Sequence, residues 1–324
     1  MSCFLLLPGE DVLAAPARWH YLSRTGTLDD SVAKQGLSLT CKHPHQLFST
    51  NAQRTWELLT QQGFDGEQNK HGLGLYQQAF LRADEQAKWQ TVHDNPNMKG
   101  RLSTHVQRWR WCPECVSEDE AEYGVPYFHR DHQLPGVFHC QKHQMALTSS
   151  CPECGWHIKL LQHQNIPPYD NVCPECGCWI GAEAPPWSDA MCYIEQASLR
   201  LARTPYQPER LEASQGLVRA IAGLPAQGQR TLAERNRILA WQWDFINMFC
   251  EQDIKAWFQQ RSLYKGRVIS PLMRNSRLNL IESVAGPVHP LLHLMVEYYI
   301  QQTTRSVDDG AQSPSTAVTG RVLL

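Results

Sequence analysis

The sequence predicts a mainly α-helical protein with small zinc-ribbon or zinc-finger elements at its centre. Helix signals, such as cap residues followed by apolar residues at helical spacing, recur on both sides of the centre. Between them, eight residues of metal-ligand type form four close pairs within positions 112–176. We therefore expect an N-terminal helical domain over 1–100, a tandem zinc-binding module over 101–183, a C-terminal helical bundle over 184–302 and a mobile tail over 303–324.

The N-terminal hundred residues carry the signals of several short helices. Proline suits a first helical turn, Asn a helix cap, and glycine the residue after a helix end. Three such helices would be compatible with a helix-turn-helix, although helix pairs joined by glycine are also ordinary packing units. The first helix is expected from about Pro16 to Gly26 and the second over 28–35. The third is expected from an Asn51 cap to Gly63, and a further helix over 80–89.

The four pairs predict two closed zinc sites. A spacer of two residues lets the chain fold back as a tight knuckle, so that both side chains of a pair point at one cation. Pairing in chain order gives one site of three cysteines and a histidine and one site of four cysteines. A cross-braced arrangement closes longer loops at greater entropic cost and stays open as an alternative. The expected ligands are Cys112 and Cys115, Cys140 and His143, Cys151 and Cys154, and Cys173 and Cys176.

Local residues refine this zinc prediction. Gly155 and Gly177 follow the second cysteine of their knuckles, where a residue that takes positive φ completes the turn. Val116 holds that place in the first knuckle, which predicts a less regular turn there. Iron in a rubredoxin-like site is the chief alternative metal for the all-cysteine set. We expect two Zn²⁺ per chain, with Cys178 as a reserve ligand.

Other uses of these cysteines fit the sequence less well. A disulfide framework needs an oxidising compartment, and the short apolar run near the N terminus lacks the features of an export signal. A redox motif would normally be a single CxxC pair. A catalytic zinc keeps one position open for water, whereas each expected site fills all four. We therefore expect no catalytic residue, and a zinc-stabilised hydrolase or nuclease is only a distant alternative.

The centre of the chain resembles a known family. Residues 110–155 read RWCPECVSEDEAEYGVPYFHRDHQLPGVFHCQKHQMALTSSCPECG, which resembles the TniQ/TnsD family of transposon target-selection proteins. The shared features are the CPxC knuckle, an aromatic-rich insert, the His-Gln-Leu-Pro-Gly-Val segment, the Cys-x-x-His pair and further CxxC pairs. The Pro8-Gly9-Glu10-Asp11 opening and a His289-Pro290 helix resemble the family more weakly.

The resemblance implies a role and partners. It implies a noncatalytic adaptor of a transposon with a heteromeric, TnsABC-type transposase, in which the adaptor links a target-recognition complex to an AAA+ transposition regulator. In that family some members bind a CRISPR effector with its guide RNA, while others, like TnsD, recognise DNA directly as site-specific binding proteins. We expect the first arrangement, with the direct reader as the alternative. DNA near the target site and a second copy of the chain, as a homodimer, are further expected partners.

Charge and hydropathy exclude some classes of protein. The formal net charge of −2 and a pI near 6.7 argue against a protein that holds DNA by bulk electrostatics alone. The sequence has no stretch of about 18 consecutive apolar residues, so no membrane helix is expected and the location expected is the bacterial cytoplasm. One segment differs from this average. Over 254–281 it has no acidic residue, and six cations are candidate contacts for a partner or nucleic acid: Lys255, Arg261, Lys265, Arg267, Arg274 and Arg277.

The alternative interpretation of that basic segment, without any binding role, is a solvated helix face followed by a loop.

The rest of the C-terminal part of the sequence predicts helices. Ser188 is expected to cap a helix through about Ala202, Thr231 and Glu234 match a capping box, and another helix is expected over 290–301. An apolar stripe is expected from Leu232, Ile238, Leu239, Phe245, Ile246 and Phe249. In the central insert, we expect Tyr123, Tyr127 and Phe128 to form a contact surface.

Overall fold

The computed structural model describes residues 5–23, 26–33, 50–67, 70–89, 108–181, 187–225, 230–258, 281 and 289–311. Helices dominate these ranges. Within them no sheet forms, and the extended segments meet only at isolated antiparallel bridges such as that between Trp111 and Thr148. The predicted class, mainly helical with small cysteine-rich elements, is therefore confirmed.

The N-terminal helices follow the predicted signals with two differences. Pro16 lies in the first turn of its helix, and Gly26 and Gly63 have positive φ angles of 69° and 87°. The third helix begins at Thr50, so Asn51 lies inside it and the predicted Asn51 cap is wrong. The helix over 74–78 was not expected, since its cap residue Leu73 makes no side-chain capping bond. The helices are α1 (Ala15–Ser23), α2 (Leu28–Ala33), α3 (Thr50–Gln61), α4 (Gly74–Gln78) and α5 (Ala83–Trp89).

The helix signals of the C-terminal part are largely confirmed. Ser188 caps its helix by accepting a hydrogen bond from the Met191 amide at 3.1 Å. Thr231 and Glu234 form the complete capping box. The last helix continues to Ala311, so residues 303–311 of the expected tail are helical and the remainder lies outside the described residues. The helices are α8 (Asp189–Leu201), α9 (Arg210–Ile221), α10 (Leu232–Asn247), α11 (Glu251–Phe258) and α13 (Pro290–Ala311).

The apolar stripe of α10 is only partly as predicted. Ile238, Phe245 and Phe249 are buried, whereas Leu232 and Leu239 are exposed. Ile238 and Leu239 are consecutive, and because a helix turns by about 100° per residue they cannot face the same side. Trp241 is buried beside Phe245 in place of Leu239, with ring centroids 5.5 Å apart.

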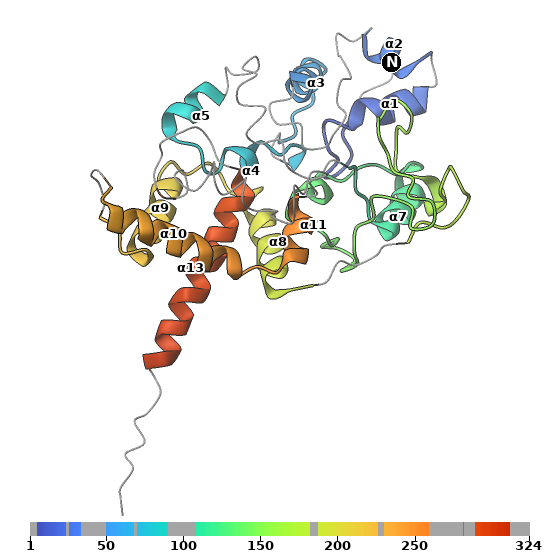
Figure 1. Ribbon diagram of the computed structural model, residues 1–324. Helices are drawn as coiled ribbons and strands as arrows, with labels where there is room; N and C mark the ends of the chain where they lie inside the picture. Colours follow the sequence, from blue (N-terminus) through green and yellow to red (C-terminus); the bar gives the residue numbers. More distant parts are fainter. Residues whose placement is uncertain are drawn as a thin grey trace, which may run out of the picture.

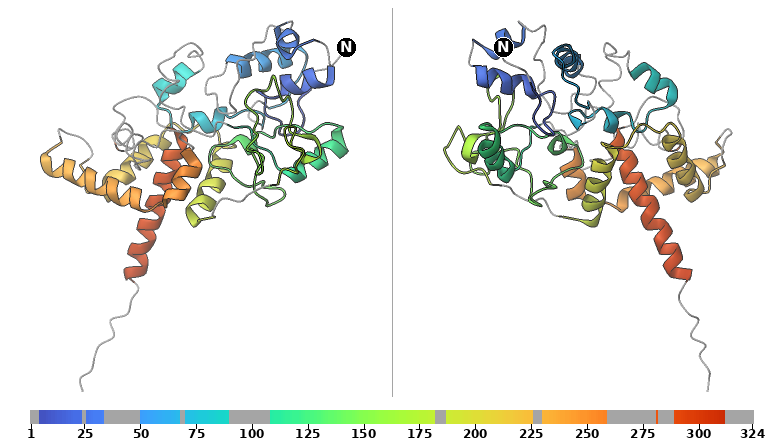
Figure 2. Two further views of the ribbon diagram at one scale, coloured as in Figure 1. Left: turned by 45° about the vertical axis from the view of Figure 1, so that its right-hand side comes forward. Right: turned by 180° about the vertical axis from the view of Figure 1, so that it is seen from behind.

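The helices gather around two hydrophobic cores. In Figures 1 and 2, α1–α3 and the central helix α7 (Pro113–Tyr123) lie on one side, and α9 and α10 lie on the other. One core joins α4 with α8, α9, α10, α11 and α13, and the other joins the N-terminal segment, Leu59 of α3 and part of the central region. Helix α13 packs against α8 and α9 and then projects away from the body (Figure 1). Among the described helices, none has the length and apolar character needed to cross a bilayer.

Candidate metal centres

The first pair of cysteines lies at the start of a helix rather than in a knuckle turn. Cys112 is the N-cap residue of α7, Pro113 occupies the first turn, and Cys115 follows within the same turn. Proline is favoured at this position because its missing N–H has no helical partner to lose. The helix therefore directs both sulfurs to the same side. It also explains why Val116 stands where the other knuckles have glycine, because a residue inside a helix needs no positive φ.

The second pair completes a four-residue cluster. Cys140 and His143 lie in a turn closed by hydrogen bonds from the Gln144 amide to the Cys140 carbonyl, at 2.8 Å, and from the Cys140 amide to the Met145 carbonyl, at 2.9 Å. His143 Nδ1 lies 3.4 Å from Sγ of both Cys112 and Cys115 and 3.6 Å from Sγ of Cys140. We call Cys112, Cys115, Cys140 and His143 cluster 1.

The remaining pairs form two similar knuckle turns. The Gly155 amide donates to the Cys151 carbonyl and the Gly177 amide to the Cys173 carbonyl, both at 2.9 Å. Both glycines have positive φ, 71° and 73°, as the sequence predicted. The Cys154 amide lowers the pKa of the Cys151 thiol to about 7, because an N–H directed at sulfur stabilises the thiolate. We call Cys151, Cys154, Cys173 and Cys176 cluster 2.

The spacing within both clusters fits a tetrahedral metal ion. In cluster 2, Sγ of Cys151 and Cys176 lie 3.6 Å apart, as do Sγ of Cys154 and Cys173. A disulfide needs a separation of about 2.05 Å. A tetrahedral Zn²⁺ with Zn–S bonds of about 2.3 Å would hold its sulfurs roughly 3.8 Å apart. Each cluster could therefore hold a metal ion, and pairs consecutive in the chain share a cluster, in the sequential rather than the cross-braced arrangement.

The free nitrogen of the cluster 1 histidine faces a carboxylate. His143 Nε2 lies 3.0 Å from Oε2 of Glu118, a residue of α7. Lys142 forms an ion pair with the same carboxylate oxygen. Both neighbours lower the pKa of Glu118, the Lys142 ammonium most. Glu118 was not expected from the sequence, although its position on the helix that starts after Cys112 could have suggested it.

The comparison with protein families identifies part of the chain. Residues 13–147 match the family model named TniQ, a span that runs from the start of α1 through cluster 1. Residues 13–147 are therefore a TniQ domain. The match supports membership of the TniQ family and indicates a transposon-associated target-selection protein. No curated protein matches the chain.

The His-Gln-Leu-Pro-Gly-Val segment, 132–137, is a structural part of the TniQ domain. The Gln133 side chain accepts from the Arg110 amide at 3.1 Å and donates to the Arg110 carbonyl at 2.7 Å. The Arg110 guanidinium donates to the carbonyls of Leu134 and Val137. Burial lowers the pKa of Arg110 to about 9, and these carbonyls offset part of the desolvation of the cation. The segment therefore holds Arg110, just before Cys112, against the chain that leads to Cys140.

Two further buried carboxylates hold the domain together. Glu10 forms a two-pronged ion pair with Arg18 of α1, with N–O distances of 2.6 and 2.7 Å. Glu195 of α8 accepts from the Phe138 and His139 amides at 2.8 and 2.9 Å, beside Cys140. A side chain added at Gly136 would approach Ser198 of α8 to 2.5 Å. Helix α8, outside the matched span, therefore packs directly on cluster 1.

The insert differs from the sequence expectation, whereas the basic segment lies mostly outside the described residues and its role stays a prediction. Tyr127 and Phe128 are buried, and Phe128 packs against Trp109, so they are core residues and the predicted contact surface is wrong for them. Of the basic segment, Lys255 lies in α11, a helix whose described part includes the buried Trp257. The other five cations, Arg261, Lys265, Arg267, Arg274 and Arg277, lie outside the described residues.

Proposed function

We propose that this chain is a noncatalytic target-selection adaptor of a transposon with a heteromeric, TnsABC-type transposase. The observation that carries the proposal is the TniQ domain over residues 13–147. The adaptor links a target-recognition complex, such as an RNA-guided CRISPR effector, to an AAA+ transposition regulator in the bacterial cytoplasm. It acts beside DNA at the target, and a homodimer is compatible with this role.

We also propose that the two clusters hold two Zn²⁺ per chain as structural ions. Each cluster offers four nitrogen or sulfur ligand atoms, which is the donor set and number of closed zinc sites. With all four positions filled by protein, none is left for a catalytic water, and this supports the noncatalytic role. Elemental analysis of purified, folded protein should find two zinc ions per chain. Folded protein with neither zinc nor iron would contradict this assignment.

The disposition of arginines supports an adaptor over a direct DNA reader. Affinity for DNA depends largely on cations that reach phosphates. Several described arginines instead donate within the protein: Arg18 to Glu10, Arg110 to Leu134, Arg203 to Asp131, Arg210 to Glu297, Arg219 to Ile281 and Arg237 to Gly223. These six arginines are therefore engaged within the protein, and the net charge of −2 gives the chain no overall attraction for phosphates.

Reconstituted transposition tests the adaptor role. With transposase, regulator and target-recognition complex, omission of this chain should abolish targeted insertion, and the chain should bring the regulator to the target complex in a pull-down. Full targeted insertion without it would refute the proposal. Gel shift with the chain alone should show weak binding with little sequence preference, whereas nanomolar binding to one sequence would support the TnsD-like reader.

The basic segment is the first place to seek a partner contact. Charge reversal at Arg261, Arg267 and Arg274 together should weaken binding of the regulator or of adjacent DNA. Zinc content and melting temperature should stay unchanged, because none of these residues is a proposed ligand. Wild-type binding by the reversed variant would remove the segment from the proposal and leave the adaptor role intact.

A further inference from the structure

Cluster 2 carries an exposed apolar face. Trp179 is 61% exposed, Val172 is 43% exposed and Tyr169 is 37% exposed. Val172 and Trp179 are partners in an antiparallel bridge, so their side chains stand on the same side of the chain. The Trp179 ring lies against Gly181, where an added side chain would come within 2.5 Å of the ring. We call Tyr169, Val172 and Trp179 the ribbon face.

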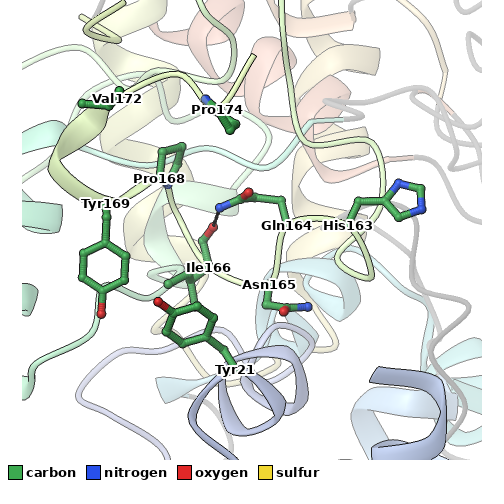
Figure 3. A pocket seen from close by; sticks show the side chains of 9 residues that line it. All are labelled: Tyr21, His163, Gln164, Asn165, Ile166, Pro168, Tyr169, Val172 and Pro174. Carbon is green, nitrogen blue, oxygen red and sulfur yellow. Dashed lines mark hydrogen bonds between the residues drawn. The ribbon is translucent and has the colours of Figure 1, made fainter. Parts of the chain in front are cut away.

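A pocket continues the ribbon face toward α1. It has a volume of about 350 Å³ and combines apolar and aromatic walls with amide and imidazole groups. Figure 3 shows Tyr21 of α1 at one end and Val172 and Pro174 at the other, with Ile166 and Pro168 between them. The rings of Tyr21 and Tyr169 lie 6.0 Å apart, which is too close for a third ring to stack between them. The pocket therefore suits an apolar side chain that enters from the ribbon face and packs on Ile166 and Pro168 rather than between the two tyrosine rings.

Hydrogen bonds to α7 hold the face in shape. The Tyr169 hydroxyl donates to the Gly124 carbonyl at 2.8 Å, and the Asp170 amide donates to Glu120 Oε1 at 3.1 Å. Asn171 donates from its side chain to the Pro113 carbonyl, also at 3.1 Å. Asp170 and Asn171 both have positive φ, 51° and 52°, an unfavourable conformation that these bonds stabilise. A surface fixed before binding loses little conformational entropy when a partner docks.

Charge decides which class of partner fits. Between positions 160 and 199 the sequence contains no lysine or arginine. Asp170, next to Tyr169, and Glu175, in the knuckle between Val172 and Trp179 in the chain, are exposed. The residues lining the pocket include neither lysine nor arginine. Such a surface repels phosphates and attracts cations, so it disfavours nucleic acid and favours a positively charged protein segment.

We propose that the ribbon face and its pocket dock a protein segment in which a large apolar side chain is flanked by lysine or arginine. The apolar side chain enters the pocket beside Tyr169 and packs on Trp179. The flanking cations face Asp170 and Glu175. This inference deepens the proposed adaptor function, since it gives the chemistry of one partner contact.

A peptide assay tests the proposal without any transposition protein. The probes are a short peptide with a central Trp-Leu pair flanked by lysines, the same peptide with glutamates in place of lysines, and a short DNA duplex. Fluorescence anisotropy against the zinc-loaded full chain should show the basic peptide binding roughly tenfold more tightly than the acidic one. Trp179→Ser and Glu175→Lys should each weaken the basic peptide by a similar factor.

Two controls distinguish binding at the ribbon face from binding elsewhere and from loss of fold. Trp243→Ser removes a tryptophan that is 67% exposed on α10 and should leave peptide binding unchanged. Zinc content of the Trp179→Ser and Glu175→Lys variants should equal that of the wild type, which excludes loss of fold. Equal binding of the two peptides, or competition of the DNA duplex for the peptide site, would overturn the proposal. Failure of reconstituted transposition to need the chain would overturn the adaptor role instead, because the peptide assay contains no regulator.

Discussion

Clusters 1 and 2 use the same ligand spacing in different surroundings. In cluster 1 all three cysteines are buried, and they belong to the core that contains α8, α10 and α13. In cluster 2 only Cys151 and Cys173 are buried, within the N-terminal core, while Cys154 and Cys176 are exposed. The CxxC spacing therefore fixes the local metal geometry, whereas the surrounding chain decides whether the site supports a core or a surface.

The two cores also cross the boundaries expected from sequence. The central region contributes cluster 1 to one core and cluster 2 to the other. Glu195 and Gly136 connect α8 to cluster 1, and Asn171 connects cluster 2 to α7. A linear division at 100 and 183 therefore stays a prediction that limited proteolysis would have to test.

The largest expected effect is loss of a cluster 1 thiolate. Metal binding contributes on the order of 10 kcal/mol in zinc-finger peptides, comparable to the whole stability of a domain. Cys115→Ser should therefore lose one zinc and unfold the helical core, seen as a loss of cooperative melting by circular dichroism. Cys176→Ser should also lose one zinc but should leave the cooperative melting of that core unchanged, because the Cys176 side chain is exposed.

Cys192→Ser, at an exposed cysteine outside both clusters, is the matched control and should keep both zinc ions. If Cys115→Ser and Cys176→Ser destabilise the protein equally, the distinction between a core-supporting and a surface site is wrong.

The contact between α8 and cluster 1 gives the next effect. Glu195→Ala would leave the Phe138 amide buried without its acceptor and remove the bond to the His139 amide. Loss of bonds to a charged acceptor costs about 3 kcal/mol in total. Chemical denaturation should show a reduction of this size, and Gln196→Ala, at the exposed neighbouring position, should show almost none. Similar values for the two variants would mean that α8 is not fixed through Glu195.

The sequence predicted the chemistry better than the packing. Spacing alone identified the eight residues that the structure brings into two clusters, and cap residues located α8 and α10, because both depend on neighbours in the chain. Glu195, Arg110 and Glu118 were missed because their partners lie far away in sequence or on another element. Burial of Tyr127 and Phe128 was missed for the same reason, since an aromatic residue is equally suited to a core and to an exposed contact.

The stability of the N-terminal core should depend on pH through the buried Asp11. Burial raises the pKa of Asp11 from 3.8 to about 7, although the Leu13 amide, 2.8 Å away, opposes the shift. Because the folded-state pKa is the higher one, this group's contribution to stability is full below 3.8 and is lost as the pH rises to about 7. Asp11→Asn can keep the bond to Leu13 and cannot ionise.

The free energy of unfolding of Asp11→Asn should therefore fall less than that of the wild type as pH rises within this window. Acidification also releases zinc from both proteins, which lowers their free energy of unfolding. The quantity to measure is therefore the difference in the free energy of unfolding between wild type and variant at each pH. Urea unfolding at a series of pH values supplies it. Parallel curves would show that Asp11 does not titrate in this range.

The smallest expected effect concerns the histidine that cluster 2 lacks. Glu118 Oε2, 3.0 Å from His143 Nε2, favours the tautomer with the proton on Nε2, which leaves the Nδ1 lone pair facing the three thiolates. Glu118→Gln should weaken zinc at cluster 1 by roughly tenfold, the lower end of such effects, because Glu118 is 44% exposed and water can replace it. Release of zinc into a chromogenic chelator should then show one of the two zinc ions leaving faster.

The matched control is Glu114→Gln, which changes an exposed glutamate next to Cys115 on the same helix. This variant should release both ions at wild-type rates, since Glu114 forms no ion pair with His143. Acceleration of both ions by Glu118→Gln would point to a general loosening of the fold, and no acceleration would show that the cysteines alone orient His143.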